Sequence, residues 1–173
     1  MLTRRFTWCA LFYLLFYFLQ VTIVDQIQFP FGSPSLFLLF ILSWAALSSP
    51  EIGAILGFSG GLLLDLSANS SGPFGLWTLI LSLIGFGIAF IRYGDEGAIA
   101  NPFIFIIYVS VAVALTLTAY LLLGMLFGIN VGSTAQILRN IIGSGSWSMI
   151  FMPILLPLNS RLHQFVFDTR ERL

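Results

Sequence analysis

Hydrophobic side chains fill six long segments of this chain, and short stretches containing Pro, Gly, Ser or charged residues separate them. The segments lie near residues 6–24, 34–49, 51–66, 73–92, 102–128 and 134–160. A helix needs about 20 apolar residues, or about 17 at the short end, to cross the hydrocarbon core of a bilayer. The pattern therefore predicts six transmembrane helices. The second and third segments are short and only "SSPE" divides them, so a five-helix model with a re-entrant segment is the alternative.

The composition indicates an integral membrane protein. Hydrophobic residues make up 58% of the 173 residues and charged residues only 8%, against about 25% charged residues in an ordinary soluble domain. No loop is long enough for a soluble domain, so we expect residues 1–173 to form one compact all-α bundle. The net charge of zero gives no basic surface for nucleic acid. We therefore expect membrane lipid and other membrane proteins as partners.

The distribution of arginine predicts the orientation of the bundle. The chain begins with "MLTRR", and the apolar stretch that follows is longer than that of a typical signal peptide, so we interpret it as a retained first helix. Six crossings with a cytoplasmic N-terminus leave Asp25 as the charged residue of the outer loops. This arrangement places both termini in the cytoplasm. The arginines that it places inside are Arg4, Arg5, Arg92, Arg161, Arg170 and Arg172.

Glycine recurs every four residues in the third segment, at Gly53, Gly57 and Gly61, and the next step of four reaches Asp65. Positions four apart lie on nearly the same face of a helix, so these residues form one ridge. Rows of small residues allow membrane helices to approach closely. The row predicts contact with another helix, either inside this protein or in a second protein. Gly124 and Gly128 supply a second pair with the same spacing.

Two charged residues lie inside predicted spans, where an aspartate at the bilayer centre costs about 2.5–3.5 kcal/mol. Asp65 ends the third segment, where it could cap the following turn or pair with Arg139 in the outer part of the last helix. Arg139 also begins a polar stripe, which could satisfy polar groups inside the bundle or line a cavity. The stripe includes Asn140, Gly143, Ser144, Trp147 and Ser148. Further on, Pro153 and Pro157 should bend or break the helix end.

The sequence offers little for catalysis. "GFSG" at residues 57–60 has the form that surrounds the nucleophile of rhomboid-type intramembrane proteases, but the only histidine, His163, follows the last span and lies far from Ser59. No paired-aspartate motif, phosphate-binding loop or His/Cys cluster accompanies it. Cys9 is the single cysteine, which excludes an internal disulfide. We expect a protein that is not an enzyme and has no metal or cofactor.

The stretch from Gly57 to Arg92 resembles the bacterial rod shape-determining protein MreD family. Members share a basic start before an aromatic-rich first helix, a glycine-rich helix that ends in G-L-L-x-D, a short polar turn with Pro and Gly, and a fourth helix that ends in Arg. The residues here that carry the resemblance are Gly57, Gly60, Gly61, Leu62, Leu63, Asp65, Pro73, Gly75 and Arg92.

The resemblance implies a scaffold in the bacterial cytoplasmic (inner) membrane, within the elongation machinery that builds the lateral peptidoglycan wall. The implied partner is the bitopic MreC. Through it or directly, such a protein would link MreB filaments to the RodA glycosyltransferase and a class B penicillin-binding transpeptidase. The implied mechanism is recognition between helix faces.

A second reading comes from a different class of protein. The hydropathy outline is also similar to the substrate-binding S components of energy-coupling-factor transporters, which are small six-helix proteins, so we expect an S-component-like fold. Such a subunit would carry an Ala-x-x-x-Ala row on its first helix, and "FTWCALFYLLFYFLQ" has none. We therefore favour the interpretation that the protein is a scaffold, and the transporter subunit is the alternative.

Overall fold

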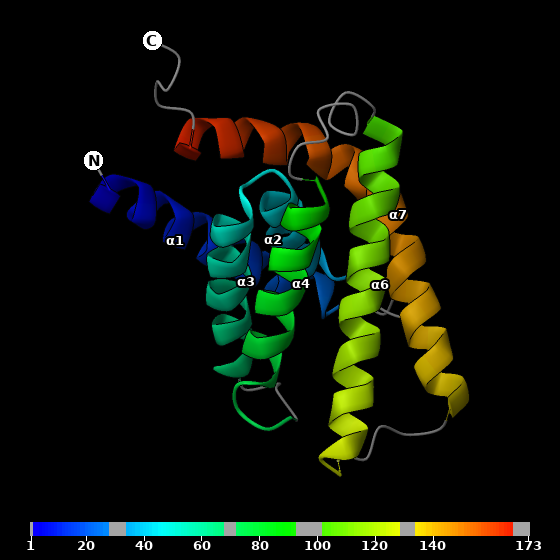
Figure 1. Ribbon diagram of the computed structural model, residues 1–173. Helices are drawn as coiled ribbons and strands as arrows, with labels where there is room; N and C mark the ends of the chain where they lie inside the picture. Colours follow the sequence, from blue (N-terminus) through cyan, green and yellow to red (C-terminus); the bar gives the residue numbers. More distant parts are fainter. Residues whose placement is uncertain (1, 28–33, 68–71, 93–101, 129–133, 168–173) are drawn as a thin grey trace.

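The computed structural model describes residues 2–27, 34–67, 72–92, 102–128 and 134–167, without the side chains of 2–6, 134–141, 164, 165 and 167. These residues form helices and turns and no strand, which confirms the all-α prediction. Each predicted segment overlaps one α-helix (Figure 1). The helices are α1 (Leu2–Leu19) with the π-helical turn η1 (Gln20–Val24), α2 (Leu36–Ala46), α3 (Pro50–Asp65), α4 (Leu76–Arg92), α6 (Pro102–Leu126) and α7 (Thr134–Phe167).

Helix α2 forms the centre of the bundle. It contacts α1, α3, α4, α6 and α7, and every residue from Phe37 to Ala46 is buried. Its sequence is apolar on all sides, which is typical of a helix surrounded by other helices. With 11 residues it is about 16 Å long, only about half the thickness of a hydrocarbon core. The second predicted segment is thus a short core helix, and it does not reach across a bilayer by its own length.

The remaining helices surround α2 and pack through aromatic and polar contacts. The ring of Phe16 in α1 stacks on Phe40 with centroids 4.1 Å apart. At the end of α4, the buried Arg92 places its guanidinium carbon 4.7 Å from the centre of the Phe105 ring in α6. The arginine that ends the fourth helix therefore joins α4 to α6.

Helix α7 changes direction near its prolines. It runs beside α6 and then turns across the end of the bundle where α4 ends, which we call the Arg92 end (Figure 1). Pro153 and Pro157 lie inside the helix, where each removes a backbone donor and crowds the preceding turn. The turned part is held by polar contacts, because Asn159 Nδ2 donates to Ser43 Oγ at 2.7 Å. The helix continues to Phe167, beyond the predicted end at residue 160.

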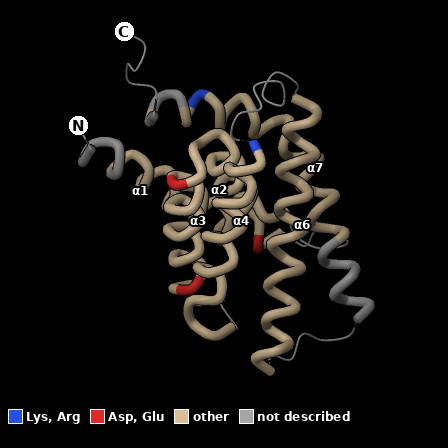
Figure 2. Tube along the Cα trace, viewed as in Figure 1, with Lys and Arg blue, Asp and Glu red and all other residues tan. Residues whose placement is uncertain are grey.

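The outer surface of the bundle suits a membrane. Two described helical segments, Thr7–Val24 and Pro102–Leu126, are long and apolar enough to span a bilayer, and Leu36–Ala46 and Leu76–Arg92 are shorter apolar helices. Figure 2 shows few charged positions along the described helices. Helix α1 begins and α7 ends at the Arg92 end (Figure 1). An even number of passes through the bundle accounts for this placement.

Candidate functional site

The glycine row of α3 packs against the backbone of α4. A Cβ atom added to Gly53 would lie 2.6 Å from the carbonyl oxygen of Gly85, and one added to Gly61 would lie 2.5 Å from Thr78 Cα. A Cβ on Gly57 would collide with the carbonyl oxygen of Leu81. Carbon atoms in contact normally stay about 3.5–4.0 Å apart, so none of these positions has room for a methyl group. The row therefore holds α3 and α4 together within the protein.

Asp65 caps the first turn of α4. Its carboxylate accepts the backbone N–H groups of Trp77 at 3.1 Å and Thr78 at 2.9 Å, and the Thr78 hydroxyl donates to it at 2.6 Å. The first N–H groups of a helix have no partner inside the helix and carry a partial positive charge, so a carboxylate there is stabilising. Asp65 is buried. The cost of its charge is offset by these three donors.

The spacing in G-L-L-L-D now has a physical reason. Gly61 lets the start of α4 touch α3, and Asp65, one turn later, accepts the first amides of that helix. Gly75 has a φ of 94°, a conformation that glycine adopts without strain, and it turns the chain into α4. The motif therefore builds a helical hairpin, which we call the α3–α4 hairpin.

The other predicted polar and glycine positions are only partly described. The side chains of Arg139 and Asn140 lie outside the described residues, so the Asp65–Arg139 pair stays a prediction. Ser144 is buried in α7, where its carbonyl oxygen accepts the Ser148 hydroxyl at 2.6 Å. The stripe is thus turned inward at these two serines.

The two glycines of the α6 pair play different parts. Gly124 is buried within α6, whereas Gly128 follows the helix with a φ of 77° and donates its N–H to the carbonyl oxygen of Met125 at 3.0 Å. A glycine in the left-handed conformation is a common end of a helix. Gly124 and Gly128 therefore do not form a ridge on one helix.

Gly87 on α4 was not among the predicted positions, and it differs from the glycines of the hairpin contact. A Cβ atom added there would meet no atom within 4 Å. Leu83 and Phe90, one turn before and one turn after it, are 65% and 61% exposed. The missing side chain is therefore not explained by packing inside the described protein. A glycine inside a helix costs about 1 kcal/mol relative to alanine, so its presence on an outer face calls for another reason.

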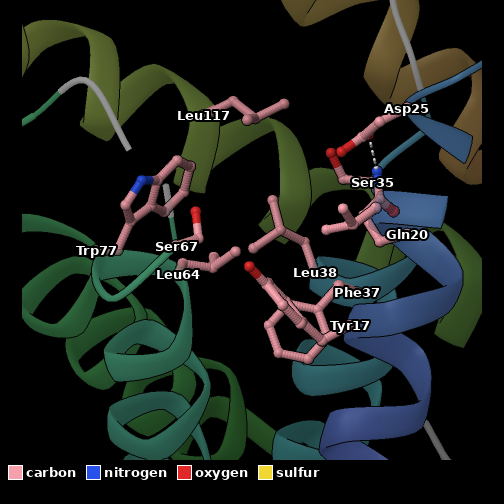
Figure 3. A pocket seen from close by; sticks show the side chains of 11 residues that line it. Tyr17, Gln20, Asp25, Ser35, Phe37, Leu38, Leu64, Ser67, Trp77 and Leu117 are labelled. Carbon is pink, nitrogen blue, oxygen red and sulfur yellow. Dashed lines mark hydrogen bonds between the residues drawn. The ribbon is translucent and has the colours of Figure 1, made fainter. Parts of the chain in front are cut away.

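A pocket of about 240 Å³ lies where α3 ends and α4 begins, which we call the Asp65 end (Figure 3). Its walls come from α1, η1, α2, α4 and α6 and from the end of α3. Gln20 holds the wall beside α2, since its Oε1 accepts the N–H of Leu36 at 2.8 Å and its Nε2 donates to Asp25 Oδ1 at 2.7 Å. The sequence reasoning missed this residue, although a glutamine that ends an apolar helix was a signal of polar contact.

Ser59 and His163 contact different groups. The Ser59 hydroxyl donates to the carbonyl oxygen of Leu56 at 3.0 Å. His163 Nε2 lies 2.9 Å from Ser48 Oγ, whose own proton goes to the carbonyl oxygen of Trp44. Ser59 and His163 therefore have different partners and do not contact each other as a nucleophile and a base. In the described part of the chain, no three His, Cys, Asp or Glu side chains gather in a group suited to a metal.

Comparison with known proteins identifies a family. The family model described as rod shape-determining protein MreD matches residues 2–165 of this chain. No curated protein and no solved structure matches it significantly.

Proposed function

The chain belongs to the family of the rod shape-determining protein MreD, and from this premise we propose that it is a non-catalytic membrane scaffold of the cell-wall elongation complex. Membership in this family assigns the protein a role in determining rod shape and indicates that it is a membrane protein. The proposal adds that this protein binds an MreC-like bitopic partner. Through that partner or directly, it links MreB filaments to a RodA-like glycosyltransferase and a class B penicillin-binding protein.

The observation that carries the proposal is the open glycine on α4. Gly53, Gly57, Gly61 and Gly85 are all explained by contact between α3 and α4, and Gly87 is not. The hydrophobic effect does not drive helices together inside a bilayer, so membrane helices associate through close packing at small residues. We assign the surface around Gly87 to the transmembrane helix of the partner and call it the Gly87 face.

The proposed topology has six passes in the inner membrane with both termini in the cytoplasm. It rests on the common placement of the start of α1 and the end of α7. Arg92 and Arg161 also belong to elements at that end, as expected for a cytoplasmic side rich in arginine. The Asp65 end then faces outward.

The Gly87 face is tested by site-specific photo-crosslinking in cells. A crosslinking amino acid replaces Leu83 or, as the matched control, Val111, which is equally apolar and 60% exposed on α6. We expect a covalent product with the MreC-like protein from position 83 and none from position 111. Equal products from both positions, or none from position 83 in cells that keep their rod shape, would contradict this docking face.

The pocket at the Asp65 end is the observation that favours the alternative, an S component of a transporter. A pocket does not by itself indicate transport, and the first helix lacks the Ala-x-x-x-Ala row with which an S component docks its coupling subunit. The scaffold therefore remains the better-supported function. Co-purification of an ATPase would decide for the transporter.

A further inference from the structure

The pocket lies beside the first turn of α2, the shortest α-helix among the described residues. Residues of the surrounding elements complete its walls. Gln20, rather than Ser35 at the N-cap position, accepts the N–H of Leu36. Ser35 makes no side-chain cap bond, so its hydroxyl remains available where it lines the pocket.

The described lining of the pocket carries a negative charge. Asp25 is the one charged residue among the described residues that line it, and its Oδ1 accepts a hydrogen bond from Gln20 Nε2, while no described residue donates to its Oδ2. The start of α2 contributes a partial charge of about +0.5, which is smaller than the full negative charge of a carboxylate. A cation is therefore favoured over an anion at this end of the pocket.

The opposite side of the pocket is mainly apolar, with Ser67 as a polar residue beside Trp77 and Leu64. Trp77 stacks on Tyr120 with centroids 4.0 Å apart, which fixes its indole ring. Figure 3 shows Trp77 on one side and Gln20 and Asp25 on the other, with Leu38 and Leu64 between them. A molecule that fits has a charged end and an apolar body.

We propose that this pocket binds an amphipathic ammonium compound, with its ammonium group on the Asp25 carboxylate and its apolar body on Leu38, Leu64 and Trp77. The two sources of such a group are the amine headgroup of a phospholipid and a soluble organic amine. Both share the chemistry that the pocket recognises. The site is independent of the Gly87 face.

The test measures binding of 2-phenylethylamine by calorimetry to the full chain in phosphatidylglycerol nanodiscs, with empty nanodiscs subtracted. The neutral analogue 2-phenylethanol has nearly the same shape and no charge. We expect the amine to bind about fivefold more tightly than the alcohol, the size of an ion pair with a solvent-exposed carboxylate. Asp25→Asn should remove this preference, and Glu51→Gln, which removes an acid outside the pocket lining, should preserve it.

A second variant tests the pocket independently of Asp25. Leu117→Trp fills the pocket from α6 and should abolish binding of both compounds, while thermal unfolding confirms that each variant is folded. Equal affinity for amine and alcohol in the wild type, a preference that survives Asp25→Asn, or binding unchanged in Leu117→Trp would each overturn the proposal. Given the expected preference, weaker amine binding in nanodiscs with phosphatidylethanolamine identifies the lipid headgroup as the source, and unchanged binding identifies a soluble amine.

Discussion

Replacing Gly61 by alanine tests the contact that builds the α3–α4 hairpin. The added methyl carbon would lie 2.5 Å from Thr78 Cα and 2.6 Å from the carbonyl oxygen of Trp77. Both are backbone atoms, so no side chain can move aside. The start of α4 must shift away from α3 by about 1 Å to restore an ordinary contact distance.

The cost has three parts. Overpacking of this kind costs about 1–3 kcal/mol. A shift of about 1 Å also stretches the bonds from Trp77 and Thr78 to Asp65, and loss of a cap costs about 1 kcal/mol. The higher helix propensity of alanine returns about 1 kcal/mol. We expect a net loss of about 2 kcal/mol, which lowers the midpoint of thermal unfolding by about 4–8 °C in a protein of this size.

The assay compares Gly61→Ala with Gly87→Ala in the same detergent, by the loss of monodisperse protein on heating. The chemical change is identical, but the new methyl group at position 87 meets no atom within 4 Å. We expect Gly87→Ala to unfold at or slightly above the wild-type temperature. A Gly61→Ala protein as stable as Gly87→Ala would refute the close contact between α3 and α4.

Three further substitutions have expected outcomes. Asp65→Ala leaves two amides of α4 without their acceptor and should cost about 2–4 kcal/mol, seen as early thermal unfolding; wild-type stability would contradict the cap. Gln20→Ala removes the acceptor at the start of α2 and should cost about 1–2 kcal/mol in the same assay. Ser59→Ala removes a bond within its own helix and should change stability by less than about 0.5 kcal/mol; cells carrying it should keep their rod shape, and round cells with normal protein levels would point to a role for this hydroxyl.

The hydrophobic pattern predicted where the helices are, because the Pro and Gly stretches between the segments interrupt helices wherever they occur. It did not predict that α2 is central. Lipid tails and a protein core are equally apolar. The sequence of a helix that is apolar on all sides therefore does not show whether lipid or other helices surround it. The burial of Phe37 and Trp44 is therefore a property of the assembled bundle.

The glycine spacing predicted a close helix contact but not the identity of the neighbour. Gly57 and Gly61 meet α4, the next helix in the chain, and a second protein would have produced the same spacing. The role proposed for Gly87 depends on the absence of described atoms near it, and a sequence pattern does not show that absence. The pocket likewise depends on the side-chain bonds of Gln20, which join residues 16 positions apart.

The most direct test of the scaffold is mild purification of the tagged protein from its native membrane, with mass spectrometry of the proteins that co-elute. Wild type is compared with Gly87→Leu, which adds bulk on the Gly87 face, and with Val111→Phe, which adds bulk on exposed α6. The account predicts an MreC-like protein with wild type and Val111→Phe, and its loss from a folded Gly87→Leu protein. Equal recovery from all three would contradict the docking face, and recovery of an ATPase and a coupling subunit instead would contradict the scaffold itself.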